Sequence, residues 1–210
     1  DANNRKIGVR HYDPYDYLVK DVAVAQTHNV SVNGKSGKTT FNIGLGYLDQ
    51  DGMNKAAKED NFKRYNASIN LTTEFNKWIT LKAGAIYSKR EKSYPYNATG
   101  VFDPWYYCYR WSDIYPMGTD ENGNELRSPA SEFSQANTAK MTRNYTNINM
   151  GLHLNILKGW TADFDYSHAN QEYIWLRPGT RFTAADTWGG ATPRLDANGN
   201  RVTVNYYGQD

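Results

Sequence analysis

The chain has 210 residues, a formal net charge of +2 and a mean hydropathy of −0.80. The near-neutral charge gives no support to nucleic-acid binding, which usually leaves a strongly basic surface, and no stretch approaches the roughly 20 apolar residues of a membrane-spanning helix. The single cysteine, Cys108, excludes an internal disulfide and a cysteine-based metal cluster.

Residues 1–25 are charged and aromatic without clear periodicity, which indicates a loop with room for a short helix at about Tyr15 to Val24. The first residues lack the apolar core of a secretion signal. We therefore expect a mature product or an internal piece of a longer chain.

Six segments then alternate apolar or aromatic residues with small or polar ones. Because side chains alternate across a strand, each segment predicts a strand with one apolar and one polar face. The expected strands cover residues 27–33, 38–48, 62–74, 78–89, 143–156 and 160–168. At about 3.3 Å per residue and a tilt near 45°, the strand at 38–48 spans a bilayer core of about 25 Å.

The connections between these strands are alternately short and long. Tight turns are expected at 34–37, where two glycines permit positive φ, at 75–77 and at 157–159. The long connections are 49–61, 90–140 and, after the last strand, 169–210, which has room for a local hairpin. Short turns at one end and long loops at the other are typical of a transmembrane β-barrel. We therefore predict an all-β antiparallel meander in a lipid bilayer.

Six strands are too few for a complete barrel, because the smallest bacterial barrels use eight. An open sheet edge in lipid leaves backbone groups unpaired at several kcal/mol each. We therefore expect these strands to form part of a larger barrel. The alternative is a surface-exposed soluble β-sandwich that binds glycans, since sandwich strands also alternate.

Aromatic residues on the apolar face fall into two bands, which favours the barrel. Those near the long-loop ends of the strands are Tyr47, Tyr65, Tyr87 and Tyr166, and those near the turn ends are Phe41, Phe75, Trp78 and Trp160. Aromatic belts on both sides of an aliphatic band are typical of a barrel surface at two membrane–water interfaces.

The other face of the expected sheet carries small and polar residues, which suit a hydrated lumen better than a dry core. The lumen-facing candidates are Arg64, Asn66, Asn149, His153, Asp163 and Asp165.

Two blocks of sequence resemble a known family. The segments 28–34 (HNVSVNG) and 41–52 (FNIGLGYLDQDG), followed by 64–71 (RYNASINL) and 78–84 (WITLKAG), resemble in order and spacing the SusC/RagA-type TonB-dependent transporters of Bacteroidetes outer membranes. The resemblance is strongest over residues 26–90 and looser beyond, where Tyr115-Pro116-Met117 precedes a turn-rich segment.

The resemblance implies an outer-membrane importer with a barrel of roughly 22 strands filled by a plug domain. In that family a SusD-like surface lipoprotein forms a lid, TonB supplies energy, and the imported nutrients are mostly oligosaccharides, with oligopeptides in some members. This chain matches only early barrel strands and contains no recognisable plug or TonB box. Energy coupling is therefore implied by the resemblance alone.

An aromatic segment in the loop at 90–140 is the best candidate for substrate binding. Flat rings present apolar faces to sugar C–H groups or peptide side chains, while charged neighbours fix polar groups. The candidates are Trp105, Tyr106, Tyr107, Tyr109, Arg110, Trp111 and Asp113. The alternative is that these rings pack the loop against its neighbours or against the lid protein.

The remaining motifs favour structural roles. Asp163 and Asp165 formally fit the two carboxylates of a glycosidase, but we expect solvated lumen carboxylates or partners of plug arginines, and no enzyme activity. The motif Asp-x-Asn-Gly-Asn occurs at 120–124 and 196–200, where we expect turns, because calcium loops place glycine one residue later and need a distant glutamate. We expect no metal and no cofactor, and a buried or half-buried thiol at Cys108.

Overall fold

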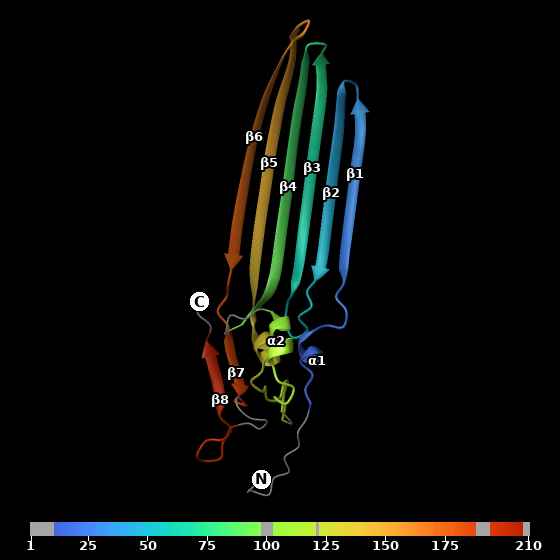
Figure 1. Cartoon of the computed structure of the whole chain (residues 1–210). Helices are drawn as coiled ribbons and strands as arrows, with labels where there is room; N and C mark the ends of the chain where they lie inside the picture. The colour runs from blue at the N-terminus through green and yellow to red at the C-terminus, as the bar shows by residue number, and fades with distance from the viewer. Residues whose placement is uncertain (1–10, 98–102, 121, 188–193, 208–210) are drawn as a thin grey trace.

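The computed structural model describes residues 11–97, 103–120, 122–187 and 194–207. Its main element is a six-stranded antiparallel sheet whose strands follow each other in chain order (Figure 1). The strands are β1 (Ala25–Ser36), β2 (Thr39–Asp51), β3 (Asn61–Asn76), β4 (Ile79–Tyr96), β5 (Asn137–Leu157) and β6 (Trp160–Leu176). Over the described residues, the prediction of an all-β antiparallel meander is confirmed.

The three tight connections are shorter than expected, because each needs only two residues. The turns are Gly37-Lys38, Lys77-Trp78 and Lys158-Gly159, with positive φ of 58° at Gly37 and 82° at Gly159. The expected turns at 34–37 and 75–77 were therefore too wide.

Gly34 belongs to β1 and lies opposite Phe41 of β2. A Cβ atom at Gly34 would lie 2.5 Å from the Phe41 ring, so the glycine makes room for the ring instead of forming the turn. At the β3–β4 connection, the Asn76 carboxamide oxygen accepts the backbone N–H groups of Trp78 and Ile79 at 2.8 and 2.9 Å and closes the turn.

The strands continue farther toward the loops than the alternation indicated. β4 ends at Tyr96, which pairs with Asn137 at the start of β5, and β6 continues to Leu176. The loop expected at 90–140 therefore begins too early and ends too late, and the one expected at 169–210 begins too early. The signal was weak because β4 there reads Lys89-Arg90-Glu91-Lys92, which gives neither face an apolar character.

Three short helices lie at the loop end, and only the first was expected. They are α1 (Pro14–Leu18), α2 (Pro104–Arg110) and α3 (Pro129–Gln135). Each begins with a proline after a capping residue, namely Asp13, Asp103 or Ser128. This arrangement is favourable because proline lacks an N–H that the first helical turn would leave unpaired. The helix expected at 15–24 is confined to α1, and α2 and α3 lie in a region expected to be a loop.

A small second sheet completes the loop end. It pairs β7 (Arg181–Ala185) with β8 (Thr203–Tyr207) in antiparallel fashion, which is the local hairpin expected after the last long strand. Asp186, which follows β7, is buried and lies 3.4 Å from the Arg127 guanidinium and 3.0 Å from that of Arg194. These ion pairs join the small sheet to the segment before α3.

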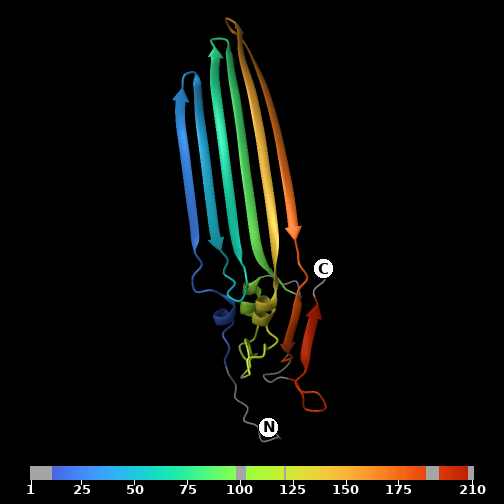
Figure 2. The ribbon, with the colours of Figure 1, turned by 180° about the vertical axis from the view of Figure 1, so that it is seen from behind.

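The core of the molecule lies at the loop end and not on the sheet. Leu18, Val19, Met117, Ala130 and Phe133 form a buried cluster between the helices. By contrast, no described element covers either face of the six-stranded sheet over most of its length, as opposite views show (Figures 1 and 2). In the described part of the chain, no helix is long and apolar enough to cross a membrane.

Candidate functional site

The sheet has one apolar face that is exposed to its surroundings. Cross-strand neighbours on this face include Val30 with Leu45, Ala83 with Met150, and Met150 with Tyr166. Val30 is 62% exposed and Met150 58% exposed. A contiguous apolar surface over six strands is far larger than water-soluble monomers usually show and indicates a surface that another apolar phase covers.

The aromatic boundaries of this face run diagonally across the sheet. The residues paired with Tyr47 on successive strands form a cross-strand row, which ends at Glu172 on β6. The boundary aromatic of β6, Tyr166, lies six residues closer to the turn. The row of Phe41 reaches β6 at Tyr166, and Trp160 again lies six residues closer. Six residues of about 3.3 Å, over four strand spacings of about 4.8 Å, give an inclination of about 45°.

The turns follow the same inclination. They step progressively outward from the β1–β2 turn to the β5–β6 turn (Figure 1). Both boundaries and the turns are therefore level only if the strands tilt by about 45°, which is close to the tilt that strands adopt in barrels.

The two faces exchange character on the loop side of Tyr47 and Tyr65. The formerly apolar face becomes charged there, with the Lys89 ammonium 2.8 Å from the Glu91 carboxylate. The formerly polar face instead gains Met141 and Trp175, which are cross-strand neighbours on β5 and β6. The apolar band on the first face therefore has a defined edge.

All six lumen candidates lie on the polar face. The Ser88 hydroxyl donates to the Asn66 carboxamide oxygen at 2.8 Å, and His153 Nδ1 lies 2.7 Å from Asp163 Oδ1. Asp165 lies over Gly151, where a Cβ would come within 2.8 Å of the Asp165 carboxylate. The remaining two, Arg64 and Asn149, occupy the same face on β3 and β5 by register.

The carboxylates of Asp163 and Asp165 do not form a desolvated pair. Both residues are exposed, and the Asp163 carboxylate is hydrogen-bonded to the His153 ring. A glycosidase acid needs an environment that keeps its carboxyl group protonated. Exposure to solvent does not supply that environment at either residue.

Helix α2 sorts the aromatic loop segment into two groups. The Asp103 carboxylate accepts the Trp105 N–H at 3.0 Å and begins the helix. Residues one helical turn apart then lie on the same face. Tyr107, Cys108 and Trp111 pack against the buried cluster of the loop end. This packing agrees with the alternative that part of the segment holds the loop together.

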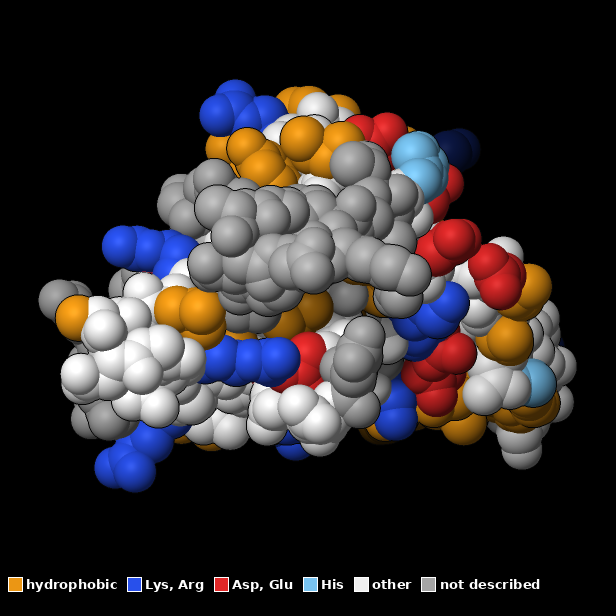
Figure 3. Space-filling model, turned by 90° about the horizontal axis from the view of Figure 1, so that it is seen from below, with side chains coloured by type: hydrophobic (Ala, Val, Ile, Leu, Met, Phe, Trp, Pro, Cys, Tyr) orange, Lys and Arg blue, Asp and Glu red, His pale blue; other side chains and the backbone are white. Residues whose placement is uncertain are grey.

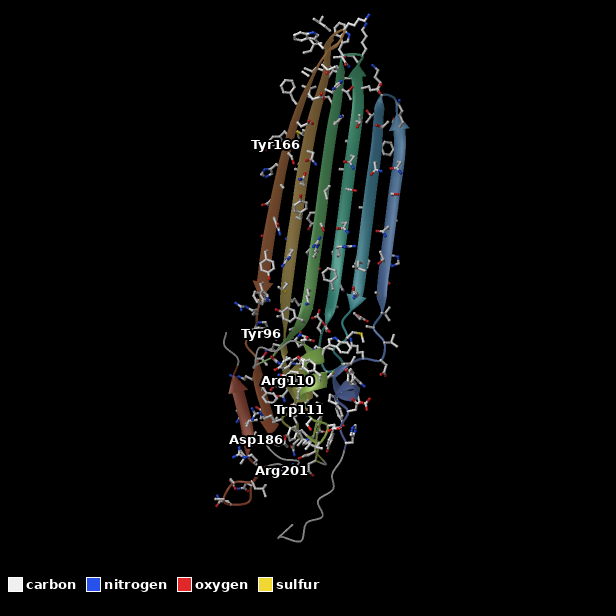
Figure 4. All side chains as sticks on the ribbon, in the orientation of Figure 1. Tyr96, Arg110, Trp111, Tyr166, Asp186 and Arg201 are labelled. Carbon is white, nitrogen blue, oxygen red and sulfur yellow. The ribbon has the colours of Figure 1, made fainter. Side chains whose placement is uncertain are left out.

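The second group faces away from that cluster. Tyr106 contacts Tyr109 with ring centroids 5.7 Å apart, and the Arg110 guanidinium lies 5.2 Å from the Tyr106 ring. Trp105 contacts Tyr15 edge-on at 6.1 Å. Figure 4 shows Arg110 and Trp111 at the loop end, beyond the long strands. Trp105, Tyr106, Tyr109 and Arg110 are therefore the members available to a ligand.

Asp113 does not join this group. Its carboxylate lies 3.0 Å from His11 Nε2, and its backbone carbonyl accepts the Tyr12 N–H at 2.8 Å. Asp113 therefore holds the segment that precedes α1.

A cavity of about 670 Å³ lies between α2 and the polar face of the sheet. It is lined by Met53, Asn54, Asp60, Lys92, Tyr94, Asp103, Pro104, Trp105, Tyr106, Met141 and Trp175. Only Trp105 and Tyr106 were predicted as site residues. The others come from the start of α2, the β2–β3 connection, β4, β5 and β6, and the register that brings Lys92, Met141 and Trp175 together is not visible in any one of these segments.

The cavity wall contains polar groups held by hydrogen bonds and one amide nitrogen without a hydrogen-bond partner among the described residues. The Trp175 indole N–H donates to the Tyr94 hydroxyl at 2.7 Å, and the Asp60 carboxylate accepts the Asn54 N–H at 3.0 Å. Asn54 is only 2% exposed, and its Nδ2 has no hydrogen-bond partner among the described residues. Flat rings with a few fixed polar groups are the usual composition of a small-molecule site.

The two Asp-x-Asn-Gly-Asn motifs form turns of the same geometry. Asp120 Oδ1 accepts the N–H groups of Asn122 and Asn124 at 2.8 and 2.9 Å, and Asp196 does the same in the second motif at 2.9 and 2.8 Å. The hydrogen bonds from Asn200 and its neighbours lower the pKa of Asp196. The described residues contain no group of three or more side chains arranged to hold a metal ion.

Burial sets the chemistry of the one cysteine. Cys108 is half-buried on the inner side of α2, and desolvation raises the pKa of its thiol. A raised pKa keeps the group protonated and unreactive at neutral pH. This placement is the half-buried thiol that we expected.

The loop end also presents a mixed outer surface. Viewed from that end, basic, acidic and hydrophobic side chains are interspersed around the rim of the molecule (Figure 3). The described chain is thus an antiparallel sheet with an exposed apolar band and a compact loop end, with an open cavity between α2 and the sheet.

Comparison with known proteins points in the same direction as the geometry. No family model matches the chain. Over 69 residues the chain is 35% identical to the TonB-dependent receptor SusC of Bacteroides thetaiotaomicron. This match covers 33% of the chain and only 6% of the length of that receptor. It supports a distant link to the receptor family.

Proposed function

We propose that the chain is a section of an outer-membrane β-barrel transporter of the SusC/RagA type. The observation that carries the proposal is the exposed apolar band, which is bounded by aromatic residues and inclined at about 45° to the hydrogen-bonded rows. Lipid covers such a band at no cost to the protein, whereas water does not. The match to SusC over a third of the chain supports the same class.

The proposal assigns a side of the membrane to each end of the sheet. The two-residue turns lie on the periplasmic side, and the loop end with α1, α2, α3 and the β7–β8 sheet lies outside the cell. β1 and β6 each have a neighbouring strand on one side only in the described chain, so further strands complete the wall. The localisation is the outer membrane of a Gram-negative, Bacteroidetes-like cell.

The transporter imports oligomeric nutrients, with oligosaccharides as the first class and oligopeptides as the second. A SusD-like lipoprotein covers the loop end, and TonB supplies energy through a part of the protein outside these strands. The aromatic rings of α2 and the cavity beneath them form part of the mouth through which substrate enters. The chain needs no cofactor for this task, and no covalent chemistry is part of the proposal.

A soluble glycan-binding sandwich is the second class considered. It requires a second sheet packed over the apolar band, and the two-stranded β7–β8 sheet at the loop end is the only further sheet in the described residues. No particular observation favours this class.

The proposed class is tested by the mass and fractionation of the protein in its native cells. We expect a detergent-requiring polypeptide several times larger than 24.0 kDa in the outer-membrane fraction. A soluble protein of 24.0 kDa would exclude the transporter.

A matched pair of variants tests the assignment of the two faces. Leu152→Lys places a charge on the apolar face of β5, near the middle of the band, and should block assembly by a cost of about 2–4 kcal/mol. His153→Lys places the same group on the polar face one residue away, opposite Asp163, and should assemble normally. Heat-dependent migration of the full-length barrel in gels measures assembly. Equal effects of the two variants would contradict the assignment.

Alanine variants of two tryptophans test the role of α2 in the assembled transporter. Trp105→Ala should weaken substrate binding without loss of assembly, because Trp105 lines the cavity. Trp111→Ala should loosen the loop end, because Trp111 packs against its buried cluster. Unchanged affinity of the Trp105 variant would remove this ring from the site.

A further inference from the structure

Three arginines lie side by side on the polar face of the sheet. Arg64 of β3 pairs with Arg90 of β4, and Arg90 pairs with Arg143 of β5, so they form one cross-strand row. Directly opposed residues of an antiparallel sheet have Cβ atoms about 4.5–5.5 Å apart, and like charges at this separation repel each other. A row of this kind destabilises the empty protein unless an anion lies across it.

No described carboxylate neutralises the row. The adjacent cross-strand rows on the same face run from Gln50 to Trp175 and from Gly46 to Gln171, and neither contains an Asp or Glu. The row from Gln50 to Trp175, on the loop side, adds the positive charge of Lys92. In the described chain, none of the three arginines takes part in a salt bridge. The Nε of Arg64 is buried and has no hydrogen-bond partner among the described residues.

The acidic residues that line the neighbouring cavity have structural roles in the loop end. Asp60 and Asp103 line the cavity beside Lys92, but the Asp60 carboxylate accepts the Asn54 N–H and the Asp103 carboxylate caps α2. The positive charge of the row therefore faces the open side of the sheet.

Aromatic rings hold the guanidinium groups at the edge of the row. The Arg143 guanidinium lies 5.0 Å from the centre of the Tyr173 ring, and that of Arg177 lies 4.1 Å from the Trp175 ring. The guanidinium is planar, and stacking of one of its faces on a ring leaves the N–H groups at its edge available for two-point binding of a carboxylate or sulfate.

The row borders the cavity under α2. Lys92, Met141 and Trp175 occupy the next cross-strand row and also line that cavity with Trp105 and Tyr106. A ligand that spans both places meets flat rings in the cavity and positive charge beside it. Sugar rings suit the flat aromatic faces, and acidic substituents suit the arginines.

We infer that Arg64, Arg90 and Arg143 bind the carboxylate or sulfate groups of an acidic oligosaccharide as it enters the barrel. The inference rests on the proposed function, because only in a barrel wall does this face line a path for substrate. The inference restricts the proposed nutrients to anionic glycans. It also means that residues of the strands, and not of the loops, recognise the negative charge.

The test uses the full-length transporter purified from outer membranes in detergent. Its probes are a galacturonic acid hexamer, a sulfated hexasaccharide from heparin, a neutral glucose hexamer and hexaglutamate, and affinities are measured by titration calorimetry. We expect at least one acidic sugar probe to bind at least about tenfold more tightly than the glucose hexamer. No acidic sugar bound more tightly than the neutral one, or equal binding of hexaglutamate, would overturn the inference.

Charge-removing variants locate the binding. Arg90→Gln/Arg143→Gln should weaken the acidic probe by about a hundredfold, since each charge-assisted contact contributes about tenfold. Lys89→Gln is the matched control, because it removes a neighbouring charge from the opposite face of β4. An unchanged affinity of the double variant, or an equal loss in the control, would overturn the assignment.

Thermal melting of the protein without probe separates substrate from an internal partner. Removing two repelling charges should leave the melting temperature unchanged or raise it. A lower melting temperature would show that an acidic segment elsewhere in the protein neutralises the row, and would overturn the inference. Fractionation of the same variants to the outer membrane reports on the proposed function independently.

Discussion

The six-stranded sheet and the loop end solve the problem of apolar surface in opposite ways. The loop end buries an apolar cluster, in which Leu18 and Phe133 are 0% exposed. The sheet keeps its apolar residues on an open face, where Phe164 is 61% exposed. The loop end therefore has the burial pattern of a protein in water, whereas one face of the sheet has the pattern of a surface that an apolar phase covers. Four predictions test this difference, from the largest expected effect to the smallest.

Removing the central ring of the loop end should separate its stability from that of the sheet. Phe133→Ala should destabilise the loop end by about 3–5 kcal/mol, because the ring is fully buried and leaves a cavity. The readout is alkylation of Cys108, located by peptide mass spectrometry, which should become much faster as the thiol is exposed. Phe75→Ala, at an exposed ring near the turns, is the control and should leave the alkylation rate unchanged. Loss of barrel assembly in the Phe133 variant would show that the two regions are not independent.

A charge on the open face should have an effect that depends on depth. Phe164→Arg lies within the apolar band of β6 and should reduce assembly by about 2–4 kcal/mol. Asn170→Arg lies on the same face of the same strand but beyond Tyr166, on the loop side, and should assemble normally. Quantification of folded barrel in outer membranes measures both. A similar loss for both variants would show that the band has no edge at Tyr166.

Removing a helix cap should have a moderate effect that is confined to the loop end. The Ser128 hydroxyl accepts the Ser131 N–H at the start of α3, so Ser128→Ala should cost about 1 kcal/mol. Hydrogen exchange of the α3 amides should accelerate, while exchange in β2 to β5 stays the same. Unchanged protection of α3 would contradict the role of the cap.

Acid should loosen the turn at 196–200 slightly. Its hydrogen bonds lower the pKa of Asp196 below the value in an unfolded chain, so their stabilisation is present above the unfolded pKa and is lost as the pH falls through the folded pKa. NMR titration of the Asn198 and Asn200 amides should follow this loss. Asp196→Asn should remove the pH dependence, and a transition that persists in this variant would assign it to another group.

The sequence predicted the regular part of the sheet because a single strand contains its own signal. Segments such as Phe41 to Tyr47 alternate strictly, and burial of one face in lipid requires that alternation. The signal ends where the outer face becomes charged, so the ends of β4 and β6 were placed too early and the start of β5 was placed too late. The helices were missed because α2 and α3 are one to two turns long, although Asp103-Pro104 and Ser128-Pro129 are typical helix starts.

The candidate site was predicted only in part, because most of it depends on register. Trp105 and Tyr106 stand out as neighbouring aromatic residues in one segment. Asn54, Lys92 and Trp175 lie far apart in the chain and meet only through the pairing of β3 to β6 and the packing of α2. The arginine row is likewise invisible until Arg64, Arg90 and Arg143 are aligned across three strands.

In the proposed barrel, the inclination of the strands gives the arginine row an order along the pore axis. Measured from the boundary aromatic of each strand toward the loops, Arg64 lies one residue beyond Tyr65, Arg90 three beyond Tyr87, and Tyr173, the β6 neighbour of Arg143, seven beyond Tyr166. In a tilted wall the three arginines therefore lie at three different depths and not at one level. An incoming anionic group would meet Arg143 first and Arg64 last. It would bind the next arginine before it leaves the previous one.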